Sequence, residues 1–439
     1  MTTREKPKRS SKNVKNAHLK RAPRAWRYPK TTVDAATDRS PTGFSTLKEA
    51  FQWPDVFLKR LGKHYGSAWL CKRLRAWRWT FSTAFSGVGA PESALTSLEK
   101  AAEHYLQSVG ARVPTHRRVL YGFTCEIDKC CRNILRNTYN SPCNFPDITA
   151  FDATKKTQFC STHNGMCKVR KHRRGNRLDV NAGGVVCTPF SKMGAQEGTA
   201  APAFATHESY YKQMGKIHDI LLVENVPEYD TDIPQQHLDQ LRDDGEERGM
   251  WGSVCAVVDP RIFGVPAARA RLFYLAFRKD RVKLRTDVTL EEIIGILTAK
   301  TVATADMFVW MELPRTVLTP AQERNLRDYR KMKSLRYPDL SQYARNGRGR
   351  GECADKTLCT LTTSSRLFSE DAKRFLDAKE LLSSQLLPVT REQSRLSRAP
   401  PLCLEGIPEG QKQKMAGNSM NAACIGVFLL AAILCFDPV

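Results

Sequence analysis

The sequence predicts an α/β protein built on a doubly wound, largely parallel sheet. From Trp79 onward, apolar stretches of strand length alternate with amphipathic stretches of helical length, which is typical of strands joined by helical crossovers. The chain has 439 residues, of which 41% are hydrophobic, enough for about two or three domains with a large core. A wholly disordered chain is therefore excluded.

The strands are expected where apolar runs have the length of a strand. These runs cover residues 80–85, 119–125, 178–186, 220–223, 253–258 and 272–277. Apolar residues recur at helical spacing between the runs, in residues 92–106 and 129–138. Ligands of such sheets bind beyond the carboxyl ends of the strands.

The charge of the chain points to a polyanionic partner. Lys and Arg total 69 against 45 Asp and Glu, which gives a net charge of +24. Because basic residues recur along the whole length, nucleic acid is favoured over a membrane surface. We expect no membrane association and a monomer.

The N-terminus is expected to form a disordered basic arm over residues 1–45. Its first thirty residues hold 11 Lys or Arg and one acid, Glu5, a composition that does not support a core. A solvated tail, a nuclear address within residues 6–12 and a phosphate-binding arm all remain open. The expected location is the nucleus, or the cytoplasm for a prokaryotic or viral protein.

The cysteines indicate a reducing compartment. Fourteen cysteines in a chain of this length, without an apolar leader at the N-terminus, are expected to be free thiols.

Residues 422–436 form an unbroken apolar run of 15, which is shorter than a bilayer-spanning helix of about 18 or more residues. A buried helix is the favoured interpretation.

Two basic segments leave alternatives open. Residues 155–177 hold eight basic residues and no acid, and the spacing of Cys160, His163, Cys167 and His172 could hold zinc. An ordinary basic loop is favoured there, and no metal is expected. Residues 324–350 interleave three tyrosines with nine Lys or Arg, which suits either a surface that grips a nucleic-acid strand or a solvated patch. The tyrosines are Tyr329, Tyr337 and Tyr343.

Two features mark a ligand pocket at the first strand ends. Phe85, Gly87 and Gly89 lie in a turn before a helix that has Pro in its first turn, where free amides can bind an anion or simply form a tight turn. Glu126 follows the second strand, where an acid grips ribose hydroxyls, while Asp128 is a candidate helix N-cap.

A cysteine and a carboxylate mark the next strand ends. Cys187 follows an apolar strand and precedes Pro189, so a thiolate there could be a nucleophile, although a structural cysteine is the alternative. Glu224 ends another buried strand and could share the same pocket.

The order of the motifs resembles the cytosine-5 DNA methyltransferase family. The set FSGVGA, CEID, PDI, GVVCTPFSKMG, ENV, GVPAARARLFYLAF and AGNSM runs from about Phe81 to the C-terminus. The resemblance implies a Rossmann-like mixed sheet, the class I methyltransferase fold, with S-adenosylmethionine as cofactor and double-stranded DNA as the most probable partner. RNA is also possible.

The resemblance also implies a division of the chain. The catalytic domain would cover residues 46–278, a target-recognition region residues 279–369, and a return segment with the C-terminal helix residues 370–439. Phe85, Gly87 and Gly89 would form the cofactor loop, with Glu126 on the ribose and Asp147 on the adenine. Asn418 would close the cofactor pocket beside the glycine turn.

The implied chemistry is covalent. Cys187 would attack carbon 6 of a flipped-out cytosine, and Glu224 would hydrogen-bond nitrogen 3 and the amino group. Arg269 and Arg271 would steady the base and the catalytic loop, and Arg271 with its basic surroundings would lower the pKa of the Cys187 thiol.

The sequence departs from the family pattern at four positions. Val186 replaces the usual Pro before the cysteine, Thr188 and Ala267 each replace a Gln, and Thr83 replaces an Asp. Activity is therefore expected rather than assured. A tRNA cytosine methyltransferase and a catalytically weakened nucleic-acid-binding protein are the alternatives, while the target context and the choice between de novo and maintenance activity stay open.

Overall fold

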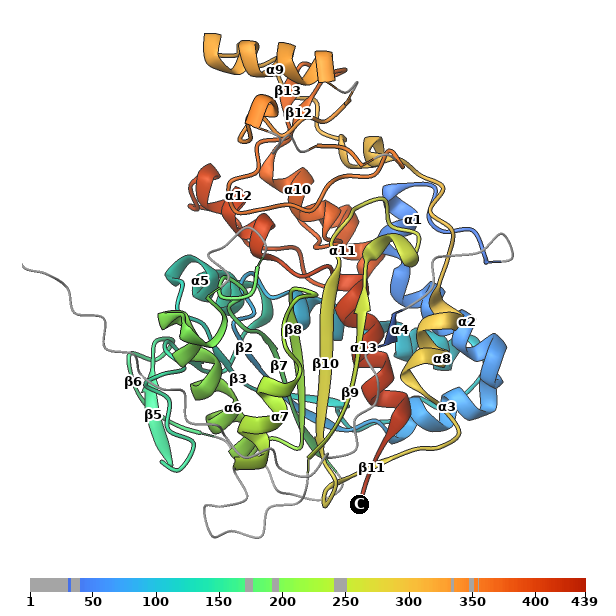
Figure 1. Ribbon diagram of the computed structural model, residues 1–439. Coiled ribbons are helices and arrows are strands. Elements are labelled where there is room, and N and C mark those ends of the chain that lie inside the picture. The colour runs from blue at the N-terminus through green and yellow to red at the C-terminus, as the bar shows by residue number, and fades with distance from the viewer. Residues whose placement is uncertain are drawn as a thin grey trace, which may run out of the picture.

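A central sheet of eight strands runs through the larger part of the molecule in the order β1-β9-β10-β8-β7-β2-β3-β4 (Figure 1). The computed structural model describes residues 31–32, 40–169, 177–191, 197–240, 251–332, 335–346, 351–353 and 355–439. The strands of this sheet are β1 (Thr31–Thr32), β2 (Trp79–Ala84), β3 (Val119–Cys125), β4 (Asn144–Phe145), β7 (Leu178–Gly184), β8 (Ile220–Asn225), β9 (Trp251–Val258) and β10 (Arg271–Arg278).

The sheet is mixed, as predicted. All of its neighbouring strands pair in parallel except β10, which is antiparallel to both β8 and β9. The predicted strands all exist, and β3 has the predicted bounds. The parallel strands β2, β3, β7 and β8 therefore bring their carboxyl ends to one edge, where the predicted site residues follow them.

Helices cover both faces of the sheet. One face carries α2 (Trp53–Tyr65), α4 (Ala90–Ser108), α5 (Lys129–Tyr139), α8 (Leu290–Leu297) and α13 (Ala422–Cys435), and the other carries α6 (Ala205–Ile217) and α7 (Asp232–Gln240). Alternate residues of β8 divide between the two cores, with Leu222 in the first and Leu221 and Val223 in the second. This is the period-two pattern of a strand buried on both faces.

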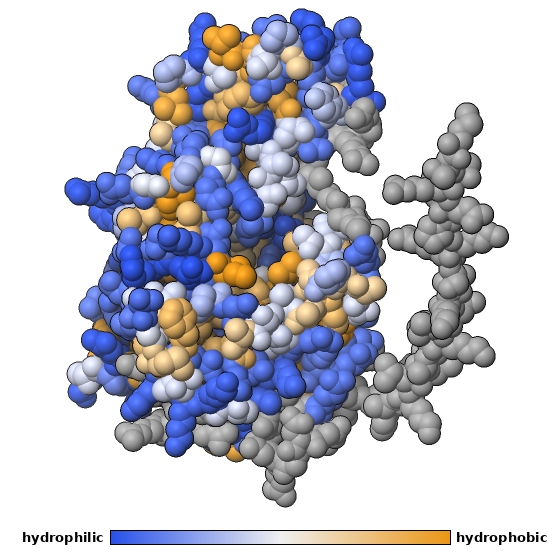
Figure 2. Space-filling view, turned by 90° about the vertical axis from the view of Figure 1, so that its left-hand side faces the viewer, coloured by the Kyte–Doolittle hydropathy of each residue, from blue (hydrophilic) through white to orange (hydrophobic). Residues whose placement is uncertain are grey.

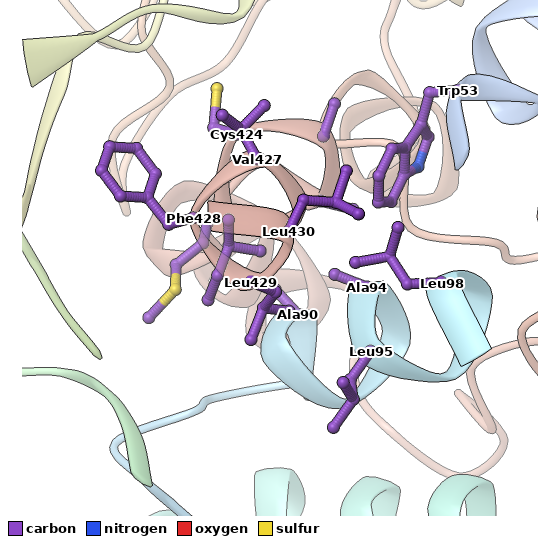
Figure 3. Packing of buried hydrophobic residues seen from close by; sticks show 14 of the residues in the cluster. Trp53, Ala90, Ala94, Leu95, Leu98, Cys424, Val427, Phe428, Leu429 and Leu430 are labelled. Carbon is purple, nitrogen blue, oxygen red and sulfur yellow. The ribbon is translucent and has the colours of Figure 1, made fainter. Parts of the chain in front are cut away.

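Helix α13 lies in the middle of the larger core, which confirms the predicted buried helix. Every residue from Ala422 to Cys435 is buried, and α13 packs against α4 and Trp53 of α2 (Figure 3). A Cβ atom at Gly426 would lie 2.2 Å from Trp53 Cη2, so glycine permits this approach. In the described chain no single helix is long and apolar enough to cross a bilayer, and α12 (Glu409–Asn418) with α13 would qualify only as a pair bent by 42°.

The last residues of the predicted disordered arm, 40–45, belong to the described fold. Residues 1–30 and 33–39 lie outside the described residues, but Thr31–Thr32 pair with β9 and belong to the sheet. The N–H of Gly43 donates to the carbonyl of Lys300, and Phe44 is buried. Three helices follow before β2, namely α1 (Leu47–Phe51), α2 and α3 (Ser67–Ala76).

The smaller lobe begins later than the predicted residue 279. Strand β11 (Val282–Leu284) pairs with the C-terminal β14 (Phe436–Pro438), and α8 packs against α2 and α13, so both belong to the larger unit. The lobe at the top of Figure 1 holds α9 (Pro320–Met332), β12 (Phe368–Ser369) and β13 (Arg374–Phe375). It has a small core of its own, formed by Leu326, Tyr329, Leu340, Ala344 and Phe368. The chain returns through α10 (Ala378–Ser384), α11 (Arg391–Ser397) and α12.

A short hairpin lies beside the β4 edge of the sheet. Its strands β5 (Thr157–Cys160) and β6 (Gly165–Lys168) pair antiparallel, within a segment for which a basic loop was predicted. The remainder of that predicted loop, residues 170–176 with His172, lies outside the described residues.

Candidate active site

The predicted glycine turn joins β2 to α4. Phe85, Gly87 and Gly89 all have positive φ, of 52°, 56° and 92°, which is costly for a phenylalanine and easy for glycine. A Cβ atom at Gly87 would meet no heavy atom within 4 Å, whereas one at Gly89 would lie 2.4 Å from Tyr139 Cε2. The turn therefore faces open space at Gly87 and packs closely on α5 at Gly89.

Glu126 lies directly against this turn. Its Oε2 accepts a hydrogen bond from the Gly87 N–H at 2.9 Å, and its Oε1 accepts from the Asp128 N–H at 3.0 Å. Burial raises the pKa of Glu126, and these two donors oppose that rise. Asp128 is a helix N-cap, as the alternative predicted, because its side chain accepts from the Cys131 N–H. A buried carboxylate thus lies beside the open face of the turn.

Asp147 is placed at the same edge of the sheet. Strand β4 pairs with β3 through Phe145 and Cys125, and Asp147 follows two residues later. Its Oδ1 accepts hydrogen bonds of 2.8 Å from both the N–H and the hydroxyl of Thr149. The turn, Glu126 and Asp147 therefore lie at the same edge of the sheet, and their roles toward a cofactor stay predictions.

The junction between α12 and α13 also reaches this region. A Cβ atom at Gly184 would lie 2.6 Å from Met420 Cε and 3.3 Å from the carbonyl oxygen of Phe85. Asn418 ends α12 and its side chain is exposed. Its predicted role in closing the pocket stays a prediction, whereas Asn421 caps α13 by accepting from the Cys424 N–H.

Cys187 and Glu224 follow or end neighbouring strands. Gly184, at the end of β7, pairs with Glu224 on β8, and Cys187 lies three residues beyond Gly184. The two side chains interact, because the Glu224 carboxylate raises the pKa of the half-buried Cys187 thiol. The sulfur and the carboxylate therefore lie near each other at the ends of adjacent strands, and their shared catalytic role stays a prediction.

The predicted low pKa of Cys187 is wrong. Burial is the largest influence and raises the pKa, Glu224 raises it further, and Arg271 and Arg269 lower it by less. The desolvation of a thiolate outweighs the nearby guanidinium groups. At neutral pH the free protein therefore holds Cys187 as a thiol.

Arg271 is paired with Glu224. The Nε of Arg271, the first residue of β10, lies 3.0 Å from Glu224 Oε1, and both side chains are largely buried, with 15% and 11% exposed. The carboxylate on β8 is thus held by the arginine of the adjacent antiparallel strand. Arg271 contributes to the site through this ion pair.

Arg269 has a different set of partners. Its Nη1 donates to the carbonyl oxygens of Gly417 at 3.1 Å and Leu361 at 3.4 Å, and Asp259 Oδ2 accepts from its N–H. Burial lowers the pKa of Arg269 to about 9. Arg269 therefore fastens the C-terminal end of α12 and the chain near Leu361 to the segment that precedes β10.

His207 on α6 holds the loop before Cys187, and the sequence did not single it out. Its Nε2 donates to the carbonyl oxygen of Val186 at 2.7 Å, and its Nδ1 lies 3.3 Å from the Tyr229 hydroxyl. Burial lowers the pKa of His207 to about 4, so the ring is neutral at pH 7. The Phe190 ring packs on Tyr229 with ring centres 4.8 Å apart.

The sequence profile of the C-5 cytosine-specific DNA methylases matches residues 111–342. The chain belongs to this family. It is thus a methyltransferase of the C-5 cytosine class, in which S-adenosylmethionine is the general methyl donor. A comparison with curated proteins found no match.

Solved structures support the methylase fold. The chain is similar to the Entamoeba histolytica methyltransferase EhMeth, with 11% identity and a TM-score of 0.51 over 81% of this chain and 98% of that one. It is also similar to the S. pombe Dnmt2 methyltransferase, with 13% identity and a TM-score of 0.51 over 81% and 98%. At these identities the likeness concerns the fold alone.

Three departures of this methylase from the family pattern have structural partners. Thr83 hydrogen-bonds the fully buried Glu92, whose pKa burial raises to about 7. Ala267 lies in a short bridge with Leu358, which joins the segment before Arg269 and Arg271 to the chain between α9 and β12. Val186 is the residue held by His207, so a side-chain donor acts where the family pattern has a proline.

The predicted aromatic surface of the methylase's smaller lobe is wrong for two of its three tyrosines. Tyr329 and Tyr337 are buried, and their hydroxyls donate to Asp339 O and to Asp306. Only Tyr343 of the three is exposed. Nearby arginines are in ion pairs, namely Arg330 with Glu370, Arg336 with Asp306 and Asp371, and Arg345 with Asp328. Composition alone does not separate a core tyrosine with a satisfied hydroxyl from a stacking platform.

Proposed function

We propose that this methylase transfers a methyl group from S-adenosylmethionine to carbon 5 of cytosine in double-stranded DNA. The observation that carries the proposal is the meeting of Cys187, Glu224 and Arg271 at the ends of three adjacent strands, beside the glycine turn. Covalent activation of a pyrimidine requires a nucleophile, a carboxyl group and a cation around the same ring.

The region of the glycine turn fits the cofactor. Gly87 borders open space, and Glu126 presents a buried carboxylate there with both oxygens on backbone donors, which leaves lone pairs for ribose hydroxyls. Asp147 lies at the neighbouring strand end for the adenine. When bound, S-adenosylmethionine supplies an electrophilic methyl group.

Cys187 is the nucleophile in this proposal. Its thiol loses a proton, the sulfur bonds to carbon 6, and the carbon 5–carbon 6 π electrons move toward carbon 5 and the ring. Carbon 5 then becomes enamine-like and can accept the methyl group. Solvent water takes the proton from carbon 5, the carbon 5–carbon 6 double bond re-forms as the carbon 6–sulfur bond breaks, and the proton held at nitrogen 3 returns to the sulfur, which restores the ring and the thiol.

Glu224 stabilises the charge that this addition places on the cytosine ring. One of its oxygens accepts from the exocyclic amino group, and the other shares a proton with nitrogen 3. Arg271 holds the carboxyl group in position through the 3.0 Å ion pair. The proton leaving Cys187 and the proton taken up at nitrogen 3 balance within the same pocket.

A DNA substrate agrees with the family and with the charge. Without the first thirty residues, which carry 11 Lys or Arg and one acid, the remaining chain keeps a net charge of +14 from the total of +24. The face of the molecule in Figure 2 is largely hydrophilic. Phosphate contacts would offset the cost of flipping a base out of the duplex, about a few kcal/mol. We also propose a nuclear location, on the basic N-terminal arm alone.

A methyl-transfer assay with labelled cofactor tests the proposal on duplex DNA and on tRNA in parallel. We expect label on duplex DNA with the wild-type chain and none with Cys187→Ser. Transfer to tRNA alone would replace the proposed substrate. Cofactor binding without transfer to either would favour the weakened nucleic-acid-binding alternative.

A further inference from the structure

Four metal-ligating side chains converge beside the β5–β6 hairpin, away from the residues of the proposed reaction. The ligand atoms of Cys143, Cys160, His163 and Cys167 all lie within 4.8 Å of one another. From the sequence, the possible zinc ligands were Cys160, His163, Cys167 and His172, and an ordinary basic loop was favoured over a metal site. The structure instead brings in Cys143, which lies 17 residues before Cys160.

The distances fit a tetrahedral metal centre. The Nδ1 atom of His163 lies 3.1 Å from the sulfur of Cys167, 3.5 Å from that of Cys160 and 3.9 Å from that of Cys143. A tetrahedral zinc ion with Zn–S bonds of about 2.3 Å and Zn–N bonds of about 2.0 Å holds a nitrogen and a sulfur ligand about 3.5 Å apart.

Hydrogen bonding alone does not account for this arrangement. One imidazole nitrogen takes part in a single good hydrogen bond, as donor or as acceptor, whereas three sulfur atoms surround Nδ1 of His163. All four side chains belong to different turns or strands, and the three cysteines are free thiols rather than disulfides. A shared cation satisfies all four groups at once.

The backbone holds the ligands in place. Strands β5 and β6 pair Cys160 with Gly165, and the backbone N–H groups of Thr162, His163 and Asn144 hydrogen-bond the Cys160 sulfur. Such donors are the outer-shell support that metal-bound thiolates usually have.

The hairpin is also fastened to the sheet at the ligands. The Ser161 N–H donates to the carbonyl oxygen of Asn144, and the carbonyl oxygen of Cys143 accepts from the Thr124 N–H, each at 2.9 Å. Cys143 thus precedes β4 directly and Cys160 ends β5. A cation bound here would join the hairpin to the edge of the main sheet.

One face of the hairpin has little apolar packing, although Cys160 on the other face belongs to the second core. Phe159 and Met166 face each other across the two strands, yet 50% and 65% of their surfaces are exposed. An isolated two-stranded hairpin is marginally stable. A bound metal would supply the missing stabilisation, as in small metal-dependent modules.

We propose that Cys143, Cys160, His163 and Cys167 bind one structural zinc ion that fastens the β5–β6 hairpin to β4. Three thiolates and one imidazole form a standard structural zinc set, and four protein ligands leave no open position for catalysis. The three thiols release their protons to solvent when the ion binds as they become thiolate ligands.

Metal analysis of the full-length chain tests this site. The chain is purified under reducing conditions from zinc-supplemented medium, and its zinc content is measured by mass spectrometry. The variants are Cys143→Ser with Cys167→Ser, the single change Cys167→His, and the control Cys130→Ser, which alters a half-buried cysteine outside the cluster.

We expect about one zinc per wild-type chain, retained in Cys130→Ser and Cys167→His and lost in the double serine variant. Cobalt added to the metal-free wild type should give the absorption of a tetrahedral thiolate complex. Because the double variant could fail to fold, circular dichroism is recorded for each. A wild-type chain that is folded but holds neither metal, or a folded double variant that keeps its zinc, would overturn the proposal.

Discussion

The Nε2 atom of His207 lies 2.7 Å from the carbonyl oxygen of Val186, the residue immediately before Cys187. His207 is fully buried and its pKa is lowered to about 4 by burial, so it acts as a neutral donor near pH 7. A side chain from α6 therefore fixes the backbone at a position where the family pattern has a proline.

Removing that donor should slow catalysis more than it weakens substrate binding. His207→Ala leaves the carbonyl oxygen of Val186 without its partner, and we expect kcat to fall roughly tenfold with KM little changed, the rate equivalent of about 1.4 kcal/mol. His207→Gln, which keeps a donor, should recover part of the rate. A loss confined to thermal stability, with kcat per folded molecule unchanged, would show that His207 does not position the nucleophile.

The thiol of Cys187 should react slowly at neutral pH. Burial and Glu224 raise its pKa above the usual 9.0, so the midpoint of alkylation by iodoacetamide, followed on the Cys187 peptide by mass spectrometry, should lie above pH 9.0. Glu224→Gln removes a negative charge, which lowers the pKa and moves the midpoint down. Arg271→Ala removes a positive charge and moves it up. A midpoint near neutrality in the wild type would contradict this.

Glu126 should contribute directly to cofactor affinity. Its carboxylate lies against Gly87, and Glu126→Ala should weaken S-adenosylmethionine binding by roughly 1–3 kcal/mol, the range for losing the partner of buried polar groups. Glu323→Ala, an exposed change in the smaller lobe, is the control. Equal calorimetric affinities for the wild type and Glu126→Ala would remove Glu126 from the cofactor site.

A pair of glycine variants tests the packing of α13. Gly426→Ala would place a Cβ atom 2.2 Å from Trp53 Cη2, and such overpacking costs typically about 1–3 kcal/mol. Gly295→Ala on α8 meets no heavy atom within 4 Å and should stabilise the helix by about 0.5–1 kcal/mol. Denaturant midpoints that shift equally for both would contradict the close contact in Figure 3.

The fold could be predicted from the sequence because its signals are local. A strand buried on both faces is a short apolar run, and β3 had its predicted bounds for that reason. The position of Cys187 and Glu224 followed from the strands that carry them. The pKa of Cys187 did not, since it depends on burial that only the packed structure defines.

Other parts of the site depend on contacts between distant segments. Cys143 joins Cys160, His163 and Cys167 only because the hairpin folds back on β4, and no spacing pattern states this. His207 reaches Val186 from another element. Tyr329 and Tyr337 show the converse, since their basic surroundings suggested a surface, whereas Tyr329 is buried in the core of the smaller lobe and Tyr337 in the larger core.

Covalent trapping tests the central claim most directly. Duplex DNA containing 5-fluorocytosine is incubated with the chain and S-adenosylmethionine, and the adduct is detected on a denaturing gel and located by peptide mass spectrometry. Because fluorine at carbon 5 blocks release of the sulfur, the wild type should accumulate an adduct at Cys187, and Cys187→Ser should form none. An adduct of equal yield with Cys187→Ser would contradict the assignment of the nucleophile.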